Sequence, residues 1–394
     1  MNNSAVGLQQ YLFISLGFFI PISIAISNII IGLLVFCWIL EGGFKIKFHT
    51  IKSLKWLLAL FALIGLYLIG LFWGENHVDA AWQFQRLALL LLFPILATIR
   101  IHQNTIKNGA IAFLSATLCS AIFAILINNN LISPLSEYIS IIHSGSQTSA
   151  FIKYNYHNVL LAIASTLCMY LLIEKKTKNR KTLIICIVIY ATSIFTESGR
   201  AGQILFNLAS LFYIIYYSRK YILRGVSLLL LLFFFQALIY NTTSVYKNRL
   251  DATSSIIKNN GDVIKGTGKN IRYIFLSESL KRIFAKPILG YGTGSFASIF
   301  NNEVTSGHDF SLHKTPHNQY IYVWFEIGIA GLCFLIFIFY YQIMDLLQKH
   351  DGIHRSLLPL TFVFLMLVDS YFFIFILTSA YIYLYTIYSR YESE

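Results

Sequence analysis

Charged residues are scarce in this sequence. Only 12% of its 394 residues are Asp, Glu, Lys or Arg, whereas about 25% is usual for a soluble domain. Hydrophobic residues account for 57%. Such a chain does not have enough polar side chains to cover a water-facing surface, which excludes a soluble globular protein. We therefore predict an all-α integral membrane protein, because backbone groups inside a bilayer must be paired within the chain.

Two further absences narrow the class. Polar loops lack cysteine, since all five cysteines fall inside apolar runs (Cys37, Cys119, Cys168, Cys186 and Cys333). We therefore expect neither a disulfide framework nor a thiolate metal site, and no metal or cofactor. The first ten residues, "MNNSAVGLQQ", have no basic segment, so we expect no cleavable signal peptide.

The hydrophobic residues occur in long runs. A membrane-spanning helix needs about 20 apolar residues, and proline or polar residues divide the longer runs into pairs. The sequence predicts twelve transmembrane helices, at about 9–21, 24–40, 54–73, 82–99, 109–127, 158–173, 182–196, 201–217, 221–240, 318–342, 357–371 and 373–389.

Lysine and arginine are distributed unevenly over the short loops between these segments. Basic residues gather in every second loop, in "GGFKIKFHTIKSLK", "RIHQNTIKN", "EKKTKNRK", "SRKYILR" and "QKHDGIHRS". Cytoplasmic loops of membrane proteins carry such an excess. The pattern predicts that both termini are cytoplasmic.

One predicted outer segment, 241–317, is far longer than the others. We therefore divide the chain into transmembrane helices at 1–240, a large outer loop at 241–317, and transmembrane helices with a short tail at 318–394. The loop holds more Lys and Arg than Asp and Glu. It either touches lipid headgroups or binds an anionic, phosphate-bearing substrate.

The outer loop contains one helix-like pattern and one glycine-rich run. Residues 270–287 predict an amphipathic helix whose apolar stripe consists of Leu276, Leu280, Ile283 and Phe284. The run "PILGYGTGSF" (287–296) follows it. A lone glycine-rich run is a weak nucleotide signal, so a tight turn before a packed segment is favoured, with phosphate binding by its backbone N–H groups as the alternative.

His317 lies at the junction between the outer loop and the tenth apolar segment. Thr315 suits a helix N-cap and Pro316 suits the first helical position. This start would place His317 and Asn318 in the first turn, with Tyr320 on the same face as the histidine. Two interpretations are open: a polar helix end bonded to the loop, or a general base.

Arginines also occur at predicted outer ends of helices. Arg200 lies in "TESGRAG" (196–202), the turn between the seventh and eighth segments, where pairing with Glu197 is one explanation. Arg272 lies in the first turn of the loop helix, against the helix dipole, which an anionic partner would explain. Arg86 lies at the outer end of the fourth segment.

Three of these pieces together resemble the O-antigen ligase family and the wider group of O-antigen polymerases and bacterial protein O-oligosaccharyltransferases. The resemblance covers residues about 190–345 and is carried by "ESGRAG", "PILGYGTGSF" and "PHNQYIYVWFEIGIAG". It implies a metal-independent, inverting glycosyltransferase of the bacterial inner membrane, with a periplasmic active site. The implied donor is an undecaprenyl-pyrophosphate-linked glycan, and the implied acceptor is lipid A–core of lipopolysaccharide. Membrane lipids are the other expected partner, and nucleic acid is not expected.

The resemblance also implies roles for single residues. His317 matches the family's essential loop histidine, Arg200 its "SGR" arginine and Arg272 the arginine of its loop helix. Arg86 matches no family motif and is added as a donor-binding candidate, with Asn318 and Tyr320 as supporting residues. The chain ends at "SRYESE", without the extra C-terminal domain of some protein oligosaccharyltransferases, so we expect those less.

Two alternatives remain. An O-antigen polymerase would use the same donor chemistry on a different acceptor, and the motifs do not separate it from a ligase. The compact length and the single dominant outer loop favour the ligase. A polytopic transporter or flippase is more remote, because such proteins place ionisable groups near the bilayer midplane and often show two related halves.

Overall fold

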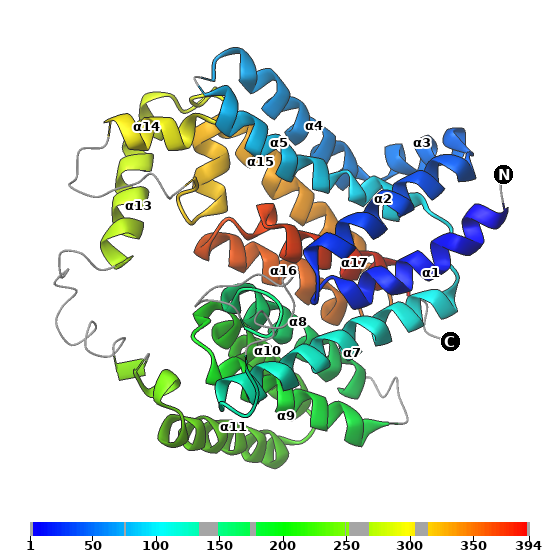
Figure 1. Ribbon diagram of the computed structural model, residues 1–394, viewed down its shortest axis with the longest axis vertical. Coiled ribbons are helices and arrows are strands. Elements are labelled where there is room, and N and C mark those ends of the chain that lie inside the picture. The colour runs from blue at the N-terminus through cyan, green and yellow to red at the C-terminus, as the bar shows by residue number, and fades with distance from the viewer. Residues whose placement is uncertain are drawn as a thin grey trace. The chain divides into compact units, whose positions relative to one another are not determined.

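A computed structural model describes residues 3–74, 76–133, 149–173, 179–248, 250–251, 268–303 and 314–391. Every regular element in these ranges is a helix (Figure 1). The α-helices are α1 Asn3–Phe19, α2 Ile24–Glu41, α3 Phe44–Ser53, α4 Lys55–Ile69, α5 His77–Leu90, α6 Leu92–Thr98, α7 Gln103–Asn128, α8 Tyr154–Ile173, α9 Arg180–Thr196, α10 Arg200–Ser218, α11 Ile222–Thr242, α13 Gly268–Ala285, α14 Ser295–Glu303, α15 Gln319–Leu347, α16 Gly352–Val368 and α17 Phe375–Arg390. The short 3₁₀ helices are η1 Gly70–Phe72 and η3 Tyr371–Phe373.

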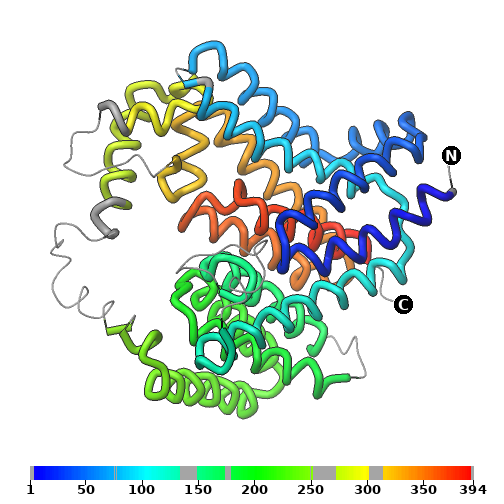
Figure 2. The backbone as a smooth tube through the Cα atoms, viewed as in Figure 1, coloured from blue at the N-terminus to red at the C-terminus, as the bar shows by residue number. Residues whose placement is uncertain are grey.

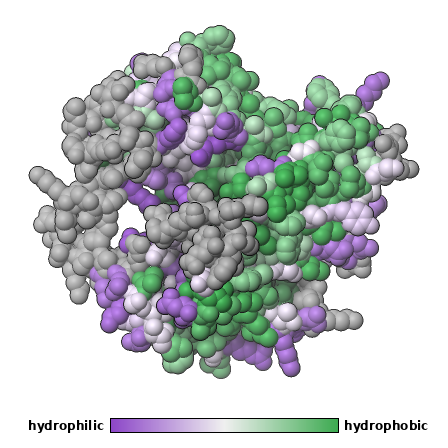
Figure 3. Space-filling view, in the orientation of Figure 1, coloured by the Kyte–Doolittle hydropathy of each residue, from purple (hydrophilic) through white to green (hydrophobic). Residues whose placement is uncertain are grey.

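The predicted all-α membrane architecture agrees with these helices. Each of the twelve predicted segments falls on a helix or on two consecutive helices. Within the described ranges, seven helical segments are long and apolar enough to cross a membrane: Ile24–Glu41, Lys55–Phe72, Val78–Thr98, Gln103–Asn128, Tyr154–Ile173, Ile222–Thr242 and Gln319–Leu347. Hydrophobic residues also form broad areas on the visible face (Figure 3). The count of twelve crossings stays a prediction, as does the division at residues 240 and 317.

The chain, whose course Figure 2 follows by residue number, forms two compact units. Unit 1 gathers the described parts of Met1–Gln10, Leu34–Gln103 and Val263–Glu394. Unit 2 gathers those of Tyr11–Leu33 and Asn104–Asp262. Unit 1 therefore contains Arg86, Arg272 and His317, and unit 2 contains Arg200.

Helix α15 is the centre of unit 1. It packs against α4, α16 and α13, and the α13 contact includes Phe284 against Trp324 in the first turns of α15. Aromatic side chains fill the core beside it, since Phe339 of α15 packs against Tyr381 of α17 and Phe372 of η3, with ring centroids 5.6 and 5.1 Å apart. The residues before and within the first turns of α15 are thus held by a rigid framework.

A break in α15 receives the glycine-rich segment. Ile327 and Gly328 leave the helical conformation, with φ of −123° and 72°. The carbonyls exposed on the N-terminal side of the break accept hydrogen bonds from this segment: Tyr291 N–H donates to Phe325 O (2.9 Å) and Gly292 N–H to Glu326 O (2.7 Å). The break is therefore a docking point for the chain that joins α13 to α14.

Helix α13 confirms the helix predicted at 270–287, but its predicted apolar stripe is only partly right, since Ile283 alone of its four residues is buried. Leu276 and Phe284 are exposed, at 43% and 69%. The buried face instead runs through Phe275, Ser279 and Ile283, at i, i+4 and i+8. The true stripe includes a serine, and a small hydroxyl between two large apolar side chains does not register in a hydrophobic pattern.

Unit 2 is built around α8. This helix packs against α9 and α10 and buries most of its side chains, from His157 to Tyr170. Helix α11 contacts α9 and α10 but keeps most of its apolar side chains exposed. The first turn of α10 lies close to α8, because a Cβ on Gly202 would clash with the Asn158 backbone.

We expect Gly328→Ala to destabilise the folded protein. An added Cβ would meet the Ile288 carbonyl oxygen at 1.8 Å, and the φ of 72° suits glycine. The strain and the lost docking predict a loss of at least about 1–3 kcal/mol, measured by thermal unfolding of the purified protein in detergent. Gly65→Ala is the matched control, because nothing lies within 4 Å of its added Cβ. Equal melting temperatures for both variants would contradict the docking role of the break.

Candidate functional site

His317 forms a pair with a carboxylate from another helix. Its Nδ1 lies 3.1 Å from Oδ1 of Asp369, which ends α16. The same oxygen accepts the Ser370 N–H at 2.7 Å, which fixes the carboxylate. Both side chains are partly exposed, at 28% and 19%. The pair is therefore ordered and accessible from outside unit 1.

This geometry has a chemical consequence for the imidazole. A carboxylate beside Nδ1 favours the tautomer that carries its proton on Nδ1, so that Nε2 provides the basic lone pair. The same carboxylate stabilises the imidazolium that forms when Nε2 takes a proton. The His317–Asp369 pair thus has the arrangement of a general base with an orienting carboxylate.

The predicted helix start beside His317 is wrong. Helix α15 begins at Gln319, not at Pro316, and its N-cap is Asn318 rather than Thr315. The Asn318 side-chain oxygen accepts the N–H groups of the second and third helical residues, at 3.0 and 3.1 Å. His317 therefore precedes the helix, with a left-handed φ of 54°. This strained conformation costs about 1–3 kcal/mol and is typical of functional sites.

The two supporting residues tie the histidine region to α16. Asn318 donates from its side chain to the carbonyl of Leu367 at 3.2 Å. The Tyr320 hydroxyl donates to the carbonyl of Val363 at 2.8 Å. Since Asp369 lies at the end of α16, both contacts fix the position of His317 relative to Asp369.

Helix α13 brings an arginine near this pair. Phe275 of α13 packs beside the imidazole of His317, with ring centroids 5.9 Å apart. Arg272 is exposed one turn earlier on the same helix, and residues three apart lie on neighbouring positions of a helix surface. Arg272 therefore lies one helical turn before Phe275, the residue of α13 that contacts His317.

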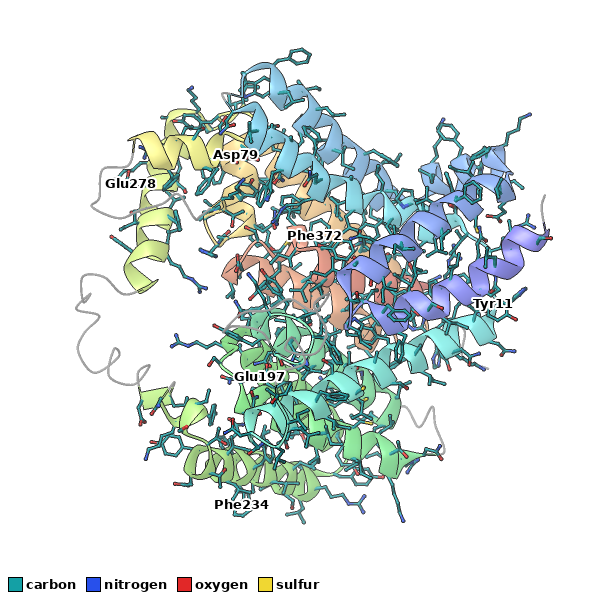
Figure 4. All side chains as sticks on the ribbon, viewed as in Figure 1. Tyr11, Asp79, Glu197, Phe234, Glu278 and Phe372 are labelled. Atoms are coloured by element: carbon teal, nitrogen blue, oxygen red, sulfur yellow. The ribbon has the colours of Figure 1, made fainter. Side chains whose placement is uncertain are left out.

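Arg86 takes part in a second cluster of unit 1, around Trp82. Its guanidinium lies 3.6 Å from the centre of the Trp82 ring, and its Nη1 donates to the Phe373 carbonyl at 2.6 Å. Lys314 lies over the same ring at 5.2 Å and pairs with Asp79 at 2.9 Å; Figure 4 labels Asp79 in α5. Two cations thus lie against one tryptophan ring, and one of them, Lys314, is three residues before His317 in the chain.

The glycine-rich segment is a packed turn, as predicted. Each backbone N–H from Gly290 to Ser295 donates within the chain, including Thr293 N–H to Gly70 O at 3.1 Å and Gly294 N–H to the Glu326 side chain at 3.0 Å. These N–H groups are already used, so the alternative of phosphate binding has no donors here. The segment positions α13 and α14 instead.

Arg200 opens helix α10 of unit 2, as predicted, and its side chain is exposed. The neighbouring Glu197 is buried, with 5% of its surface exposed. Its carboxylate lies 3.1 Å from Nδ1 of His157 and 2.5 Å from the hydroxyl of Ser149; Figure 4 labels Glu197 among these helices. The acid beside Arg200 therefore anchors the α9–α10 turn to the interior.

A buried polar network extends from this carboxylate. Nε2 of His157 lies 2.9 Å from the hydroxyl of Ser120 in α7, and His157 is only 1% exposed. The next residue, Asn158, donates to the Gly199 carbonyl at 3.2 Å. Because Gly199 immediately precedes Arg200, the network fixes the backbone that carries the arginine.

Sequence reasoning missed Asp369 and His157. Each has its partner far away in the chain, 52 residues from Asp369 to His317 and 40 from His157 to Glu197. One signal was present, since an ionisable residue inside an apolar run is by default a functional candidate. Asp369 in "LMLVDSYFF" and His157 before "NVLLAIA" both fit that rule. In the described part of the chain, no three His, Cys, Asp or Glu residues gather in a way that would hold a metal.

Residues 185–336 match the model of the family described as O-antigen ligase. This match confirms the resemblance predicted from the three motifs. The matched segment contains Arg200, Arg272 and His317, whereas Arg86 and Asp369 lie outside it.

The chain is also similar to a ComP-specific O-oligosaccharyltransferase of Acinetobacter baylyi. The two are 23% identical over 369 residues, which cover 85% of this chain and 64% of the relative. The chain thus spans less than two thirds of that relative's length.

We expect His157→Ala to destabilise unit 2. The change removes the partner of a buried carboxylate and of the Ser120 hydroxyl, which predicts a loss of about 3 kcal/mol or more. Thermal unfolding in detergent measures it, with His49→Ala as the control because His49 is exposed. A second comparison adds Glu197→Gln to both proteins. If the two changes are additive, the His157–Glu197 contact does not carry the effect.

Proposed function

We propose that the protein is an O-antigen ligase, which transfers a glycan from an undecaprenyl-pyrophosphate donor to lipid A–core at the periplasmic face of the bacterial inner membrane. The match to the ligase family supports glycan transfer. The observation that carries the chemistry is the His317–Asp369 pair, 3.1 Å apart and partly exposed. In this proposal both termini are cytoplasmic, as the loop charges predict.

The proposed reaction is a single displacement with inversion. The acceptor hydroxyl oxygen forms a bond to the anomeric carbon while the bond from that carbon to the pyrophosphate oxygen breaks. The hydroxyl proton goes to Nε2 of His317, and Asp369 stabilises the resulting imidazolium. A positioned general base typically contributes about 10²–10⁴-fold to the rate.

The leaving pyrophosphate is an anion, and the proposal assigns its neutralisation to arginines. Arg272 and Arg200 are the exposed arginines that the family motifs contain. A guanidinium pairs with two phosphate oxygens at once and stays charged at any working pH. The proposed reaction is therefore metal-independent, with protein cations at the leaving group.

Arg86 is proposed as a further donor-binding residue. Its stacking on Trp82 and its bond to the Phe373 carbonyl hold the guanidinium in place. The same tryptophan ring contacts Lys314, three residues from His317. A preorganised cation contributes more to binding of an anion than a mobile one, because less side-chain entropy is lost.

Two other acceptors fit the same donor chemistry. A polymerase would use a second lipid-linked repeat unit in the same chemistry. The Acinetobacter relative is an O-oligosaccharyltransferase named as specific for ComP. Because the motifs of this chain also resemble those of bacterial protein O-oligosaccharyltransferases, a protein acceptor is the second candidate here. The donor half of the reaction is common to all three.

Complementation of a deletion strain tests donor and acceptor together. We expect loss of the gene to leave unextended lipid A–core while long glycan accumulates on the polyprenyl carrier, seen on gels of both fractions. Wild-type protein restores the glycan, and His317→Ala does not. His350→Ala is the control, because His350 forms another histidine–aspartate pair, with Asp351 at 2.8 Å, and is 73% exposed. Single repeat units on the core would indicate a polymerase, and normal lipopolysaccharide with an unglycosylated protein would indicate a protein acceptor.

Asp369→Asn tests the orienting carboxylate. The amide keeps the shape but removes the charge that stabilises the imidazolium, so we expect transfer to fall by at least about tenfold. Transfer by purified protein with a lipid-linked donor measures the rate. Unchanged transfer by Asp369→Asn would remove Asp369 from the mechanism.

Arginine-to-lysine changes test the bidentate role. Arg272→Lys and Arg200→Lys keep the charge but lose the planar pair of donors, so we expect each to lower the transfer rate by about tenfold or more. Arg282→Lys is the control, because Arg282 of α13 is already paired with Glu278 at 2.8 Å. Full activity in both test variants, at normal expression, would rule out bidentate phosphate binding.

A further inference from the structure

Unit 2 contains a large cavity that the proposed reaction does not use. Its volume is about 1130 Å³, just above the range of about 300–1,000 Å³ that is usual for small-molecule sites. The end of α8 and helices α9, α10 and α11 line it. Most of the lining is aliphatic or aromatic, including Ile184, Val188, Phe206, Leu228 and Leu231.

The cavity opens to the surroundings of the helices through apolar side chains. Val188 of α9 is 52% exposed and Leu231 of α11 is 61% exposed, and both line the cavity. Only 11% of α11 is buried within the chain; Phe234 on the same helix, labelled in Figure 4, is 68% exposed. In a bilayer the surroundings of such a helix are acyl chains, so a lipid tail has direct access to the cavity.

Positive charge gathers at one end of the cavity. Arg180 at the start of α9, Lys220 after α10 and Arg224 in the first turn of α11 all line it. Arg224 lies over the Tyr221 ring at 4.7 Å and donates to the Tyr217 hydroxyl at 3.4 Å. Among the described residues, no acidic side chain lines the cavity and no ion pair includes these three cations.

The dimensions of the cavity fit one leaflet of a bilayer. Its lining on α9 runs from Arg180 to Ala191, which is about 16 Å at 1.5 Å per residue. Half of the hydrocarbon core of a bilayer is about 15 Å. The three cations also belong to the loops that the charge pattern predicts to be cytoplasmic, where anionic lipids are enriched.

We propose that this cavity binds an anionic phospholipid of the cytoplasmic leaflet. The phosphate lies among Arg180, Lys220 and Arg224, whose charge no carboxylate of the described residues offsets, and an acyl chain lies between α9 and α11. The tyrosines of the rim, Tyr217 and Tyr221, occupy the level of the headgroups, as aromatic residues do at membrane interfaces.

Lipid binding to the purified, delipidated full chain tests this proposal without reference to glycan transfer. Native mass spectrometry measures binding of phosphatidylglycerol and of phosphatidylcholine. We expect the combined change Arg180→Gln, Lys220→Gln and Arg224→Gln to weaken phosphatidylglycerol binding by at least about tenfold, with little change for phosphatidylcholine. The control Lys45→Gln, Lys52→Gln and Lys55→Gln removes three exposed cations elsewhere and should bind as the wild type does.

A second variant tests the apolar part of the cavity. Leu231→Trp places a larger side chain at an exposed lining position, so we expect it to weaken phosphatidylglycerol binding while thermal unfolding is unchanged. Three results would overturn the proposal: wild-type protein that does not prefer phosphatidylglycerol, a cation variant that binds it normally, or displacement of phosphatidylglycerol by undecaprenyl phosphate at lower concentration. The last would make the cavity a site for the isoprenoid carrier.

Discussion

The structure of unit 1 depends on how one interrupted helix satisfies its backbone. A helix break inside a bilayer leaves polar groups that water does not reach, and each costs several kcal/mol if unpaired. In α15 the carbonyls of Phe325 and Glu326 are paired by Tyr291 and Gly292 of the glycine-rich segment. That pairing joins the segment after α13 to the middle of α15. It thereby places Phe275 against the histidine that precedes α15.

Three histidine–carboxylate pairs occur in the described residues, and their burial separates their roles. They are His157–Glu197, His317–Asp369 and His350–Asp351, with histidine side chains 1%, 28% and 73% exposed. The first is sealed inside unit 2, where no substrate atom reaches it, and it positions a turn. The third joins adjacent residues at the surface. Of the three pairs, only His317–Asp369 joins the ends of two helices and is also partly exposed. It lies beside α13, which carries Arg272.

The sequence predicted the helices well because membrane insertion depends on composition over about 20 residues, which is a local property. The roles of His317, Arg200 and Arg272 stay predictions, taken from two short motifs and from the loop helix. The sequence analysis placed the start of α15 three residues early, because Thr315 and Asn318 are both acceptable caps, whereas in the structure the Asn318 side chain caps the helix. Asp369 and His157 escaped because their partners are distant in the chain, so no periodicity or spacing links them.

The groups that pair with the break in α15 precede it in the chain, which matters during synthesis and membrane insertion. Synthesis runs from the N-terminus, so Gly70 and residues 287–294 exist before Ile327 and Gly328 emerge. The donors that pair with the break, and the Pro287 carbonyl that accepts the Ile329 N–H, are thus available as soon as the interrupted helix is complete. A helix with an interruption of this kind can enter the bilayer without waiting for any later part of the chain.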